Sequence, residues 1–344
     1  MKAAVLTGLE EIEIIDKPDP VLKDENDVLM KVNAVGVCGS DIHYYKTGRI
    51  GDQIIHYPFQ IGHEFVATVT EIGSNVTRVK PGDVVAVDPA IYCGECDQCL
   101  QDRKHTCRKL VFLGNPDEHE GCLAEYLVLP EICCFPMGEN ADLDCGVLVE
   151  PLSIGNYAAS FIKNLDVKTV GILGAGPIGL SVLLNLREYD VDRVYMTDKL
   201  DYRVENAKTS GALWAGNPDK TDVAVEIQSK EPLLLDAVFE CCGQQEAIDQ
   251  AMQILKPGGH LILVGIPEVD NIQFNIHDMR RKEITFHNVR RQNECMDSTM
   301  NFISKNKDVT ALITHKYKMD DIVNAFELVS SYGDGVIKAV IELD

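Results

Sequence analysis

A glycine-rich turn, Gly174-x-Gly176-x-x-Gly179, restricts the fold more than any other feature of this sequence. A β-branched run at residues 169–173 precedes it, and a helical apolar pattern at residues 180–189 follows it. The next predicted strand ends at Asp198, 19 residues after the last glycine. Strand, glycine turn, helix and acid in this order predict a βαβ unit that binds a dinucleotide, with the pyrophosphate at the helix N-terminus.

The predicted coenzyme is NAD. Asp198 can accept hydrogen bonds from both ribose hydroxyl groups, and its charge would repel the 2′-phosphate of NADP. Lys199 and Arg203 lie close by in the sequence, and their positive charges would weaken that preference. The predicted coenzyme site comprises Gly174, Gly176, Pro177, Ile178, Gly179, Asp198, Lys199, Arg203, Val264 and Arg291.

With 344 residues the chain is long enough for two domains, and its character changes near residue 150. Before that point, β-branched runs such as residues 28–32 and 65–72 predict a β-rich domain. From about residue 166 to 287, strands alternate with helical patterns, as in a parallel α/β sheet. A final strand at residues 335–341 is too short to form a domain, so we expect it to return to the β-rich part.

Four cysteines lie within fifteen residues of one another: Cys93, Cys96, Cys99 and Cys107. Zinc in structural sites is tetrahedral and binds thiolates well, so four thiols at this spacing predict one closed zinc site. Four protein ligands leave no position for a substrate. We therefore expect this zinc to be structural and the chemistry to occur elsewhere.

A second group of metal-binding residue types flanks the cysteine cluster. Cys38, His63 and Glu64 lie upstream, and Glu150 lies downstream. Thiolate, imidazole and carboxylate together form the mixed ligand sets of catalytic zinc sites, which keep one position open. These residues are far apart in the sequence, so only the fold can bring them together.

Charge and targeting signals narrow the possible partners. The chain has 32 basic and 54 acidic residues, a formal charge of −22, which repels phosphate backbones and anionic lipid. Residues 1–13 contain no long apolar run, so no signal peptide is predicted. No stretch of the sequence approaches the eighteen or more uncharged apolar residues of a membrane span. The seven cysteines outside the two metal proposals are expected to be reduced thiols of a cytoplasmic protein.

The motifs together resemble the zinc-dependent medium-chain alcohol dehydrogenases, and within them the sorbitol (polyol) dehydrogenases. The resemblance spans essentially the whole chain. It rests on the four-cysteine cluster, the glycine turn and three further motifs in the family's order: Cys38-Gly39-Ser40-Asp41-Ile42-His43, Gly62-His63-Glu64 and Glu150-Pro151-Leu152-Ser153-Ile154-Gly155. It implies an α/β protein in which a GroES-like catalytic domain, residues 1–152 and 289–344, is interrupted by a Rossmann coenzyme domain, residues 153–288.

The resemblance also implies how the metal site is built. Cys38 and His63 would bind a catalytic zinc. Glu64 and Glu150 would be its acidic members, one binding the metal directly and the other holding its water, in an order that the sequence leaves open. Asp41 would orient the His63 imidazole from the far side of the ring.

The implied reaction is oxidation of a secondary alcohol. Zinc would lower the pKa of the bound alcohol, and a hydride would pass from a polyol to NAD, leaving a ketose. Ser40 and His43 would relay the released proton, since histidine titrates near neutral pH. The alternative for His43 is an ordinary surface histidine or one that contacts the coenzyme ribose.

Two segments that would contact substrate depart from the family pattern. In the first, Phe112 fits, but Asn115 replaces the usual threonine and the loop is about one residue longer. In the second, Arg291 fits, whereas Arg290 and Gln292 replace aromatic residues. The pocket should therefore be more polar and more cationic, which suits a different polyol or a phosphorylated one, unless Arg290 faces solvent or the coenzyme pyrophosphate. The expected substrate residues are Tyr44, Phe112, Asn115, Glu150 and Arg291.

Two other functions compete with polyol oxidation. L-threonine 3-dehydrogenases share the four-cysteine cluster, but they typically carry threonine in place of Ser40 and a different sequence after Pro151. A non-enzymatic zinc protein on the same scaffold should have lost ligands that this chain retains. The resemblance also implies a homotetramer or homodimer, with residues 283–287 as a candidate edge strand at a two-fold interface.

Overall fold

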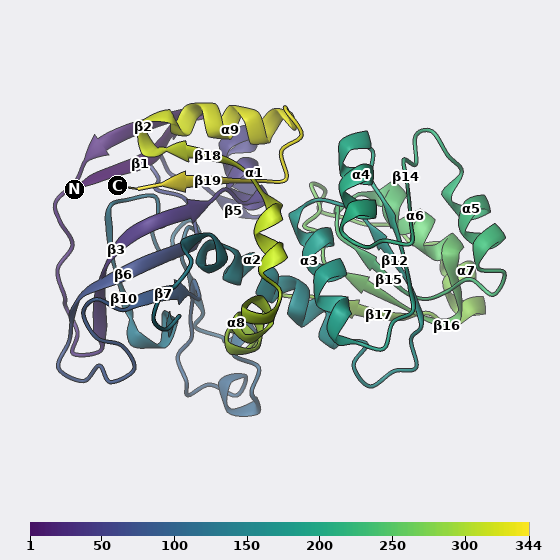
Figure 1. Ribbon diagram of the computed structural model, residues 1–344, viewed down its shortest axis with the longest axis horizontal. Helices are drawn as coiled ribbons and strands as arrows, with labels where there is room; N and C mark the ends of the chain where they lie inside the picture. The colour runs from purple at the N-terminus through teal and green to yellow at the C-terminus, as the bar shows by residue number, and fades with distance from the viewer. Residues whose placement is uncertain (344) are drawn as a thin grey trace. The chain divides into compact units, whose positions relative to one another are not determined.

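The computed structural model describes residues 1–343, which form two compact units. Unit 1 combines Met1–Glu150 with the segment from Met296 onward, and unit 2 is Pro151–Cys295. Unit 1 therefore contains both the purple start and the yellow end of the chain in Figure 1. The sequence-based division falls at 152/153 and 288/289, whereas the contacts divide the chain at 150/151 and 295/296.

The largest sheet of unit 1 joins strands from both ends of the chain. Its strands are β3 (Asp27–Gly36), β6 (Glu64–Ile72), β7 (Val84–Val87), β10 (Tyr126–Pro130), β11 (Cys134–Pro136), β18 (Ile313–Lys318) and β19 (Lys338–Glu342). They follow the order β11-β7-β6-β3-β19-β18, and β10 also pairs with β3. β19 is antiparallel to β3 and parallel to β18, so the C-terminal strand does return to the β-rich unit.

Smaller elements surround this sheet. The strands β1 (Lys2–Gly8) and β2 (Glu11–Asp16) form an N-terminal antiparallel hairpin. Two-residue pairs join β4 (Arg49–Ile50) to β5 (Gln53–Ile54) and β8 (Ala90–Ile91) to β9 (Val111–Phe112). The helices are α1 (Gly39–Thr47), α8 (Met296–Lys305), α9 (Ile322–Ser331) and the first part of α2 (Leu143–Ser160).

Helix α1 is not evident from apolar periodicity, and local capping explains it. Cys38 is the N-cap residue, and the Asp41 carboxylate accepts a hydrogen bond from the Cys38 backbone N–H at 3.0 Å. The helix ends at Gly48, whose left-handed φ of 69° lets its N–H bond to the Tyr44 carbonyl. The caps thus define a nine-residue helix directly after a predicted metal ligand.

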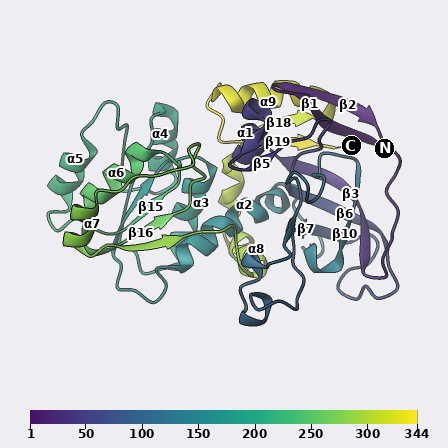
Figure 2. The ribbon, with the colours of Figure 1, turned by 180° about the vertical axis from the view of Figure 1, so that it is seen from behind.

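Unit 2 is built around a parallel sheet, which confirms the predicted α/β fold. Its strands run in the order β14 (Trp214–Gly216), β13 (Arg193–Thr197), β12 (Thr169–Leu173), β15 (Leu235–Glu240), β16 (Leu255–Leu263) and β17 (Thr285–Asn288), and every pair is parallel. Figure 2 shows the helices that flank this sheet: α3 (Pro177–Asn185), α4 (Asp201–Thr209), α5 (Val223–Lys230), α6 (Gln245–Ile254) and α7 (Ile276–Lys282). β17 lies at one edge.

Residues 256–259 are part of β16: pairing with β15 jumps from Leu255 to His260, so these residues bulge from a continuing strand. Two local predictions need correction. The last strand begins at Lys338, because Gly335 has a left-handed φ of 70°. Helix α3 begins at Pro177, since proline suits the first turn of a helix. In the described part of the chain, residues 1–343, none of the helices combines the length and the apolar character needed to cross a bilayer.

Candidate active site and metal centres

The fold brings three of the four residues predicted for the catalytic zinc together. One ligand atom each of Cys38, His63 and Glu64 lies within 4.8 Å of the others. Cys38 stands where β3 gives way to α1, and the other two stand at the start of the neighbouring strand β6. His63 and Glu64 are buried. Sulfur, imidazole nitrogen and carboxylate oxygen are the donor set of a catalytic zinc, so the residues fit this ion.

Asp41 lies behind the His63 ring, as a residue that orients a metal ligand would. Its Oδ1 is 3.5 Å from His63 Nδ1 and accepts a hydrogen bond from the Gly62 N–H at 3.2 Å. Burial lowers the pKa of His63, but the charges of Asp41 and Cys38 outweigh it and raise the pKa above its usual value. The edge of the site is aromatic, because the Phe112 ring lies 5.4 Å from the His63 ring.

Lys338 completes this cluster, and the sequence did not single it out. Its Nζ donates to both oxygens of Glu64, at 2.9 and 2.6 Å, and to the Val37 carbonyl at 3.1 Å. Both side chains are almost fully buried, with 2% and 1% exposure. Burial alone lowers the pKa of Lys338, but the charge of Glu64 and then of Cys38 raises it overall. A lone lysine in the apolar run Val336–Ile341 was the available signal.

The charges of the same cluster influence the pKa of Glu150. It is 6% exposed, and its pKa is raised to about 7. Burial is the main cause; the charge of His63 lowers the pKa, those of Glu64 and Asp88 raise it, and that of Lys338 lowers it. Among residues 1–343, the three-residue ligand group does not include Glu150. Glu150 is therefore a buried acid that senses the charges of the ligand group without belonging to it.

The predicted proton-relay residues share one helix. Ser40 and His43 are half-buried on α1, three residues apart and therefore on the same face. Tyr44, a predicted substrate residue on the next position, is 2% exposed, and its hydroxyl donates to Gln53 at 3.4 Å. Helix α1 thus carries three candidate residues within six positions after the metal-ligand candidate Cys38.

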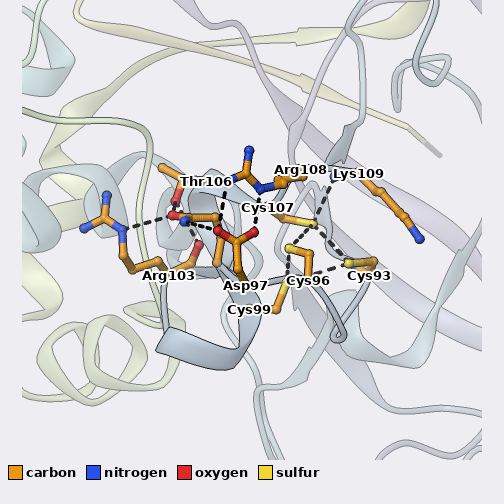
Figure 3. A network of polar contacts seen from close by, with 10 residues as sticks. Cys93, Cys96, Asp97, Cys99, Arg103, Thr106, Cys107, Arg108 and Lys109 are labelled. Carbon is orange, nitrogen blue, oxygen red and sulfur yellow. Dashed lines mark hydrogen bonds and ion pairs between the residues drawn. The ribbon is translucent and has the colours of Figure 1, made fainter.

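The four cysteines form a compact lobe in unit 1 (Figure 3). Their sulfur atoms are 3.5 to 4.0 Å apart for the pairs 93–107, 96–99, 96–107 and 93–99. A tetrahedral zinc with bonds of about 2.3 Å places its sulfur ligands about 3.8 Å apart, so this lobe fits the ion. Backbone N–H groups lower the pKa of Cys96 to about 6, whereas burial raises that of Cys99 to about 12.

Exposed ion pairs hold the lobe on its outer side. Asp97 accepts two hydrogen bonds from the Arg108 guanidinium, at 2.5 and 2.9 Å, and Glu95 accepts one from Lys109 at 2.6 Å. Figure 3 shows Asp97 and Arg108 directly beside the sulfur cluster. The two acids lie between the first three cysteines and the two bases directly follow the fourth, so ligands and ion pairs are built from one short segment.

The glycine turn in unit 2 has the geometry that a dinucleotide site needs. Gly174 has a left-handed φ of 100°, and a Cβ on Gly179 would lie 1.8 Å from the Gly174 carbonyl oxygen. Asp198 accepts hydrogen bonds from the N–H groups of Ala175 at 2.8 Å and Leu200 at 2.9 Å. This carboxylate therefore lies directly over the turn, and each oxygen keeps a lone pair for a ribose hydroxyl.

The other predicted coenzyme residues are less uniformly placed. Pro177 and Ile178 open α3, directly after the turn. Arg203 Nη1 lies 3.8 Å from Asp198 and would lie 3.3 Å from a Cβ on Gly176, so this arginine joins the turn. Lys199 is fixed through its backbone, whose carbonyl accepts from Asn217. Val264 follows β16, and Arg291 has a left-handed φ of 54° beyond β17.

Comparisons with known proteins cover the whole chain. Two family models match it: an alcohol dehydrogenase GroES-like domain at residues 24–139 and a glucose dehydrogenase C-terminus at residues 143–343. Sorbitol dehydrogenase of Bacillus subtilis is 31% identical over 99% of this chain and 97% of its own length. L-idonate 5-dehydrogenase of Vitis vinifera is 32% identical over 99% and 94%.

A solved structure agrees with these sequence relatives. The crystal structure of an oxidoreductase/dehydrogenase of unknown specificity from Escherichia coli has a TM-score of 0.92 and 32% sequence identity to this chain. The match covers 100% of this chain and 99% of that one. The fold of both units therefore follows one known architecture.

Proposed function

Because this chain belongs to the zinc-dependent medium-chain alcohol dehydrogenases, in the group of sorbitol and related polyol dehydrogenases, we propose that it oxidises a secondary alcohol of a polyol to a ketose. Zinc and NAD are its cofactors. The observation that carries the proposal is the group of half-buried Cys38 with buried His63 and Glu64, a catalytic donor set in a chain that also has a closed four-cysteine lobe.

Cys38 and His63 would hold the catalytic zinc, with Glu64 or Glu150 as its acidic ligand. Bound zinc and NAD would supply a Lewis acid for the alcohol oxygen and an acceptor for the hydride. Asp41 fixes the His63 ring through Nδ1, which leaves Nε2 free to face a metal. Lys338 holds Glu64 in one orientation and compensates part of the negative charge that the acids and Cys38 bring to a dry site.

Proton release would follow helix α1. Ser40 and His43 share one face of this helix, one turn apart, and a histidine can take up and release a proton near neutral pH. In unit 2, Asp198 would accept both hydroxyls of the adenosine ribose and so favour NAD over NADP. Arg203 lies beside Asp198, and its charge would weaken this preference.

A spectrophotometric assay of NADH formation tests the function. The purified protein should reduce NAD with at least one member of a panel of neutral polyols, and NADP should serve less well. The same panel should include polyol phosphates, L-idonate and L-threonine. Activity with threonine alone, or with none of the polyols, would overturn the proposal.

We also propose that the protein acts in the cytoplasm as a homotetramer or homodimer. The support is the exposed sheet edge at β17, which has unpaired backbone groups on its outer side in the single chain. Light scattering after size exclusion gives the mass directly, and a 38.1 kDa particle would contradict the proposal.

A further inference from the structure

A polar chain of side chains runs from helix α1 to the loop that follows β9. Tyr44 donates to Gln53 Oε1 at 3.4 Å, and Gln53 Nε2 donates to Glu118 Oε1 at 3.3 Å. Glu118 accepts two further hydrogen bonds, from Asn115 Nδ2 at 3.3 Å and from the Phe112 N–H at 2.7 Å. One carboxylate therefore joins three residues of two separate segments.

The charge of Glu118 fixes the orientation of the two amide groups that hydrogen-bond to it. An ionised carboxylate can only accept hydrogen bonds, so both neighbouring amides must turn their NH₂ groups towards it. The amide oxygens then face away: Gln53 accepts the Tyr44 proton, and Asn115 is left with Oδ1 as its outward group. Across residues 1–343, no side chain or backbone group donates to Asn115 Oδ1.

This outward oxygen lies on the segment that packs against the candidate zinc site. Asn115 is 6% exposed. Two residues before it, Leu113 is fully buried, and a Cβ on Gly114 would lie 3.0 Å from the carbonyl of Gly62, directly before His63. Phe112 contacts the His63 ring. The loop that Glu118 fixes is therefore part of the wall of the catalytic site.

We propose that Glu118 is a positioning residue that fixes Asn115 as a pure acceptor, so that the site selects an uncharged polyol hydroxyl over a phosphate. This inference rests on the proposed polyol oxidation. A hydroxyl can donate to Asn115 Oδ1, whereas a phosphate dianion has only acceptors to offer and would also meet the charge of Glu118. Arg290 and Arg291, which the sequence suggests for phosphate, would then serve the coenzyme or face solvent.

The test compares Glu118→Gln with Asp117→Asn. The first variant keeps the size of the side chain but can donate as well as accept, so the Asn115 amide is free to rotate. The second removes one negative charge from the neighbouring exposed position, and asparagine suits its left-handed φ of 61°. Both are assayed for NADH formation with neutral polyols, polyols lacking one hydroxyl, and polyol phosphates, and checked for zinc content and melting temperature.

We expect Glu118→Gln to raise KM for the preferred polyol about tenfold with kcat within about twofold, equivalent to the loss of one neutral hydrogen bond between the substrate and Asn115. It should also reduce the preference over polyol phosphates, and Asp117→Asn should change neither. Adding Glu118→Gln to Asn115→Leu should cause no further loss, because both act through one contact.

Three results of the kinetic assays would overturn the inference. They are equal KM values for Glu118→Gln and Asp117→Asn, additive losses in the double variant, and a wild-type preference for polyol phosphates. A parallel fall in kcat, zinc content and melting temperature would show that Glu118 only stabilises the loop, and would also overturn it. Absence of polyol activity in the wild-type protein refutes the proposed function itself, and the inference with it.

Discussion

The four-cysteine lobe and the Cys38–His63–Glu64 cluster both gather metal-binding side chains in unit 1, but they are built in opposite ways. The lobe takes its ligands from residues 93–107, a single short segment braced by exposed ion pairs. The catalytic cluster takes its three members from two separate parts of the chain. A third part supplies Lys338, 274 residues after Glu64, which compensates a buried charge. Local spacing is sufficient for the first site, whereas the second exists only in the folded sheet.

This difference separates stability from chemistry. A site made of one segment and closed by four ligands can hold that segment in shape without touching a substrate. A site assembled from β3, β6 and β19 depends on the packing of the whole sheet and can keep a ligand position open. Damage to the two sites should therefore have different consequences, which the following experiments separate.

Replacing a catalytic ligand should have the largest effect. Cys38→Ser removes the thiolate, so we expect kcat for the preferred polyol to fall by roughly 10³-fold or more, because a Lewis acid supplies several kcal/mol of catalysis. Zinc content should fall from two ions per chain to one. Cys145→Ser, at a buried position outside both clusters, serves as the control. Full activity in Cys38→Ser would refute the zinc mechanism.

Breaking the buried ion pair should be nearly as damaging, but through the fold. Lys338→Met leaves the Glu64 carboxylate buried without its cation, and removing one partner of such a pair typically costs about 3–5 kcal/mol. Urea unfolding measures the loss, and metal analysis should show depletion of the catalytic zinc with the lobe still occupied. Lys338→Arg keeps the charge and should recover much of the stability. Unchanged unfolding of Lys338→Met would mean that the pair has no structural weight.

Opening the lobe should affect stability more than turnover. In Cys99→Ser the closed site loses its most buried sulfur, and we expect a fall in melting temperature of roughly 4–8 °C, as for a loss of about 2 kcal/mol. Turnover per remaining catalytic zinc should stay within about threefold of wild type. If kcat collapsed while the fold and the oligomer persisted, the two sites would not be separable in the way proposed here.

The smallest expected effect on stability comes from the contact between His260 and His287. This pair is neutral, in contrast to the ion pair of Glu64 and Lys338. His260 Nδ1 lies 3.1 Å from His287 Nε2 in unit 2, and the Phe161 ring also packs against His287, with 5.3 Å between the ring centroids. Burial is the main cause that lowers the pKa of both rings. The charge of Lys256 lowers the pKa of His260 further, and Asp236 partly opposes this. For His287, the second cause is the neighbouring His260.

A lowered pKa in the fold means that the unfolded chain binds protons first as pH falls. The stability that the neutral pair contributes is therefore complete above about pH 6.5, the ordinary histidine value, and is lost towards lower pH. Melting temperatures from pH 8 to 5 should fall more steeply for wild type than for His287→Gln, by about 2 °C or less. A steeper acid loss in the variant would reverse the assigned sign.

The sequence predicts those features whose causes are local. The strand, glycine turn and acid of the coenzyme site lie within 30 residues, and Gly174 and Gly179 occupy positions where backbone geometry admits glycine. Helix α1 was missed because its caps, not its apolar pattern, define it. Lys338 was missed because its partner is on another strand of the sheet, and a lysine within an apolar strand does not say which acid it meets.

The origin of Lys338 in the final strand has a consequence for biosynthesis. Because 274 residues separate it from Glu64, the acid has no partner while the ribosome makes the intervening chain, which includes all of unit 2. Units of a nascent chain generally fold once their own residues have emerged, so unit 2 can fold before unit 1 is complete. The last strand to arrive would thus neutralise the active site and close the sheet in one step, and a chain released before residue 338 would lack both.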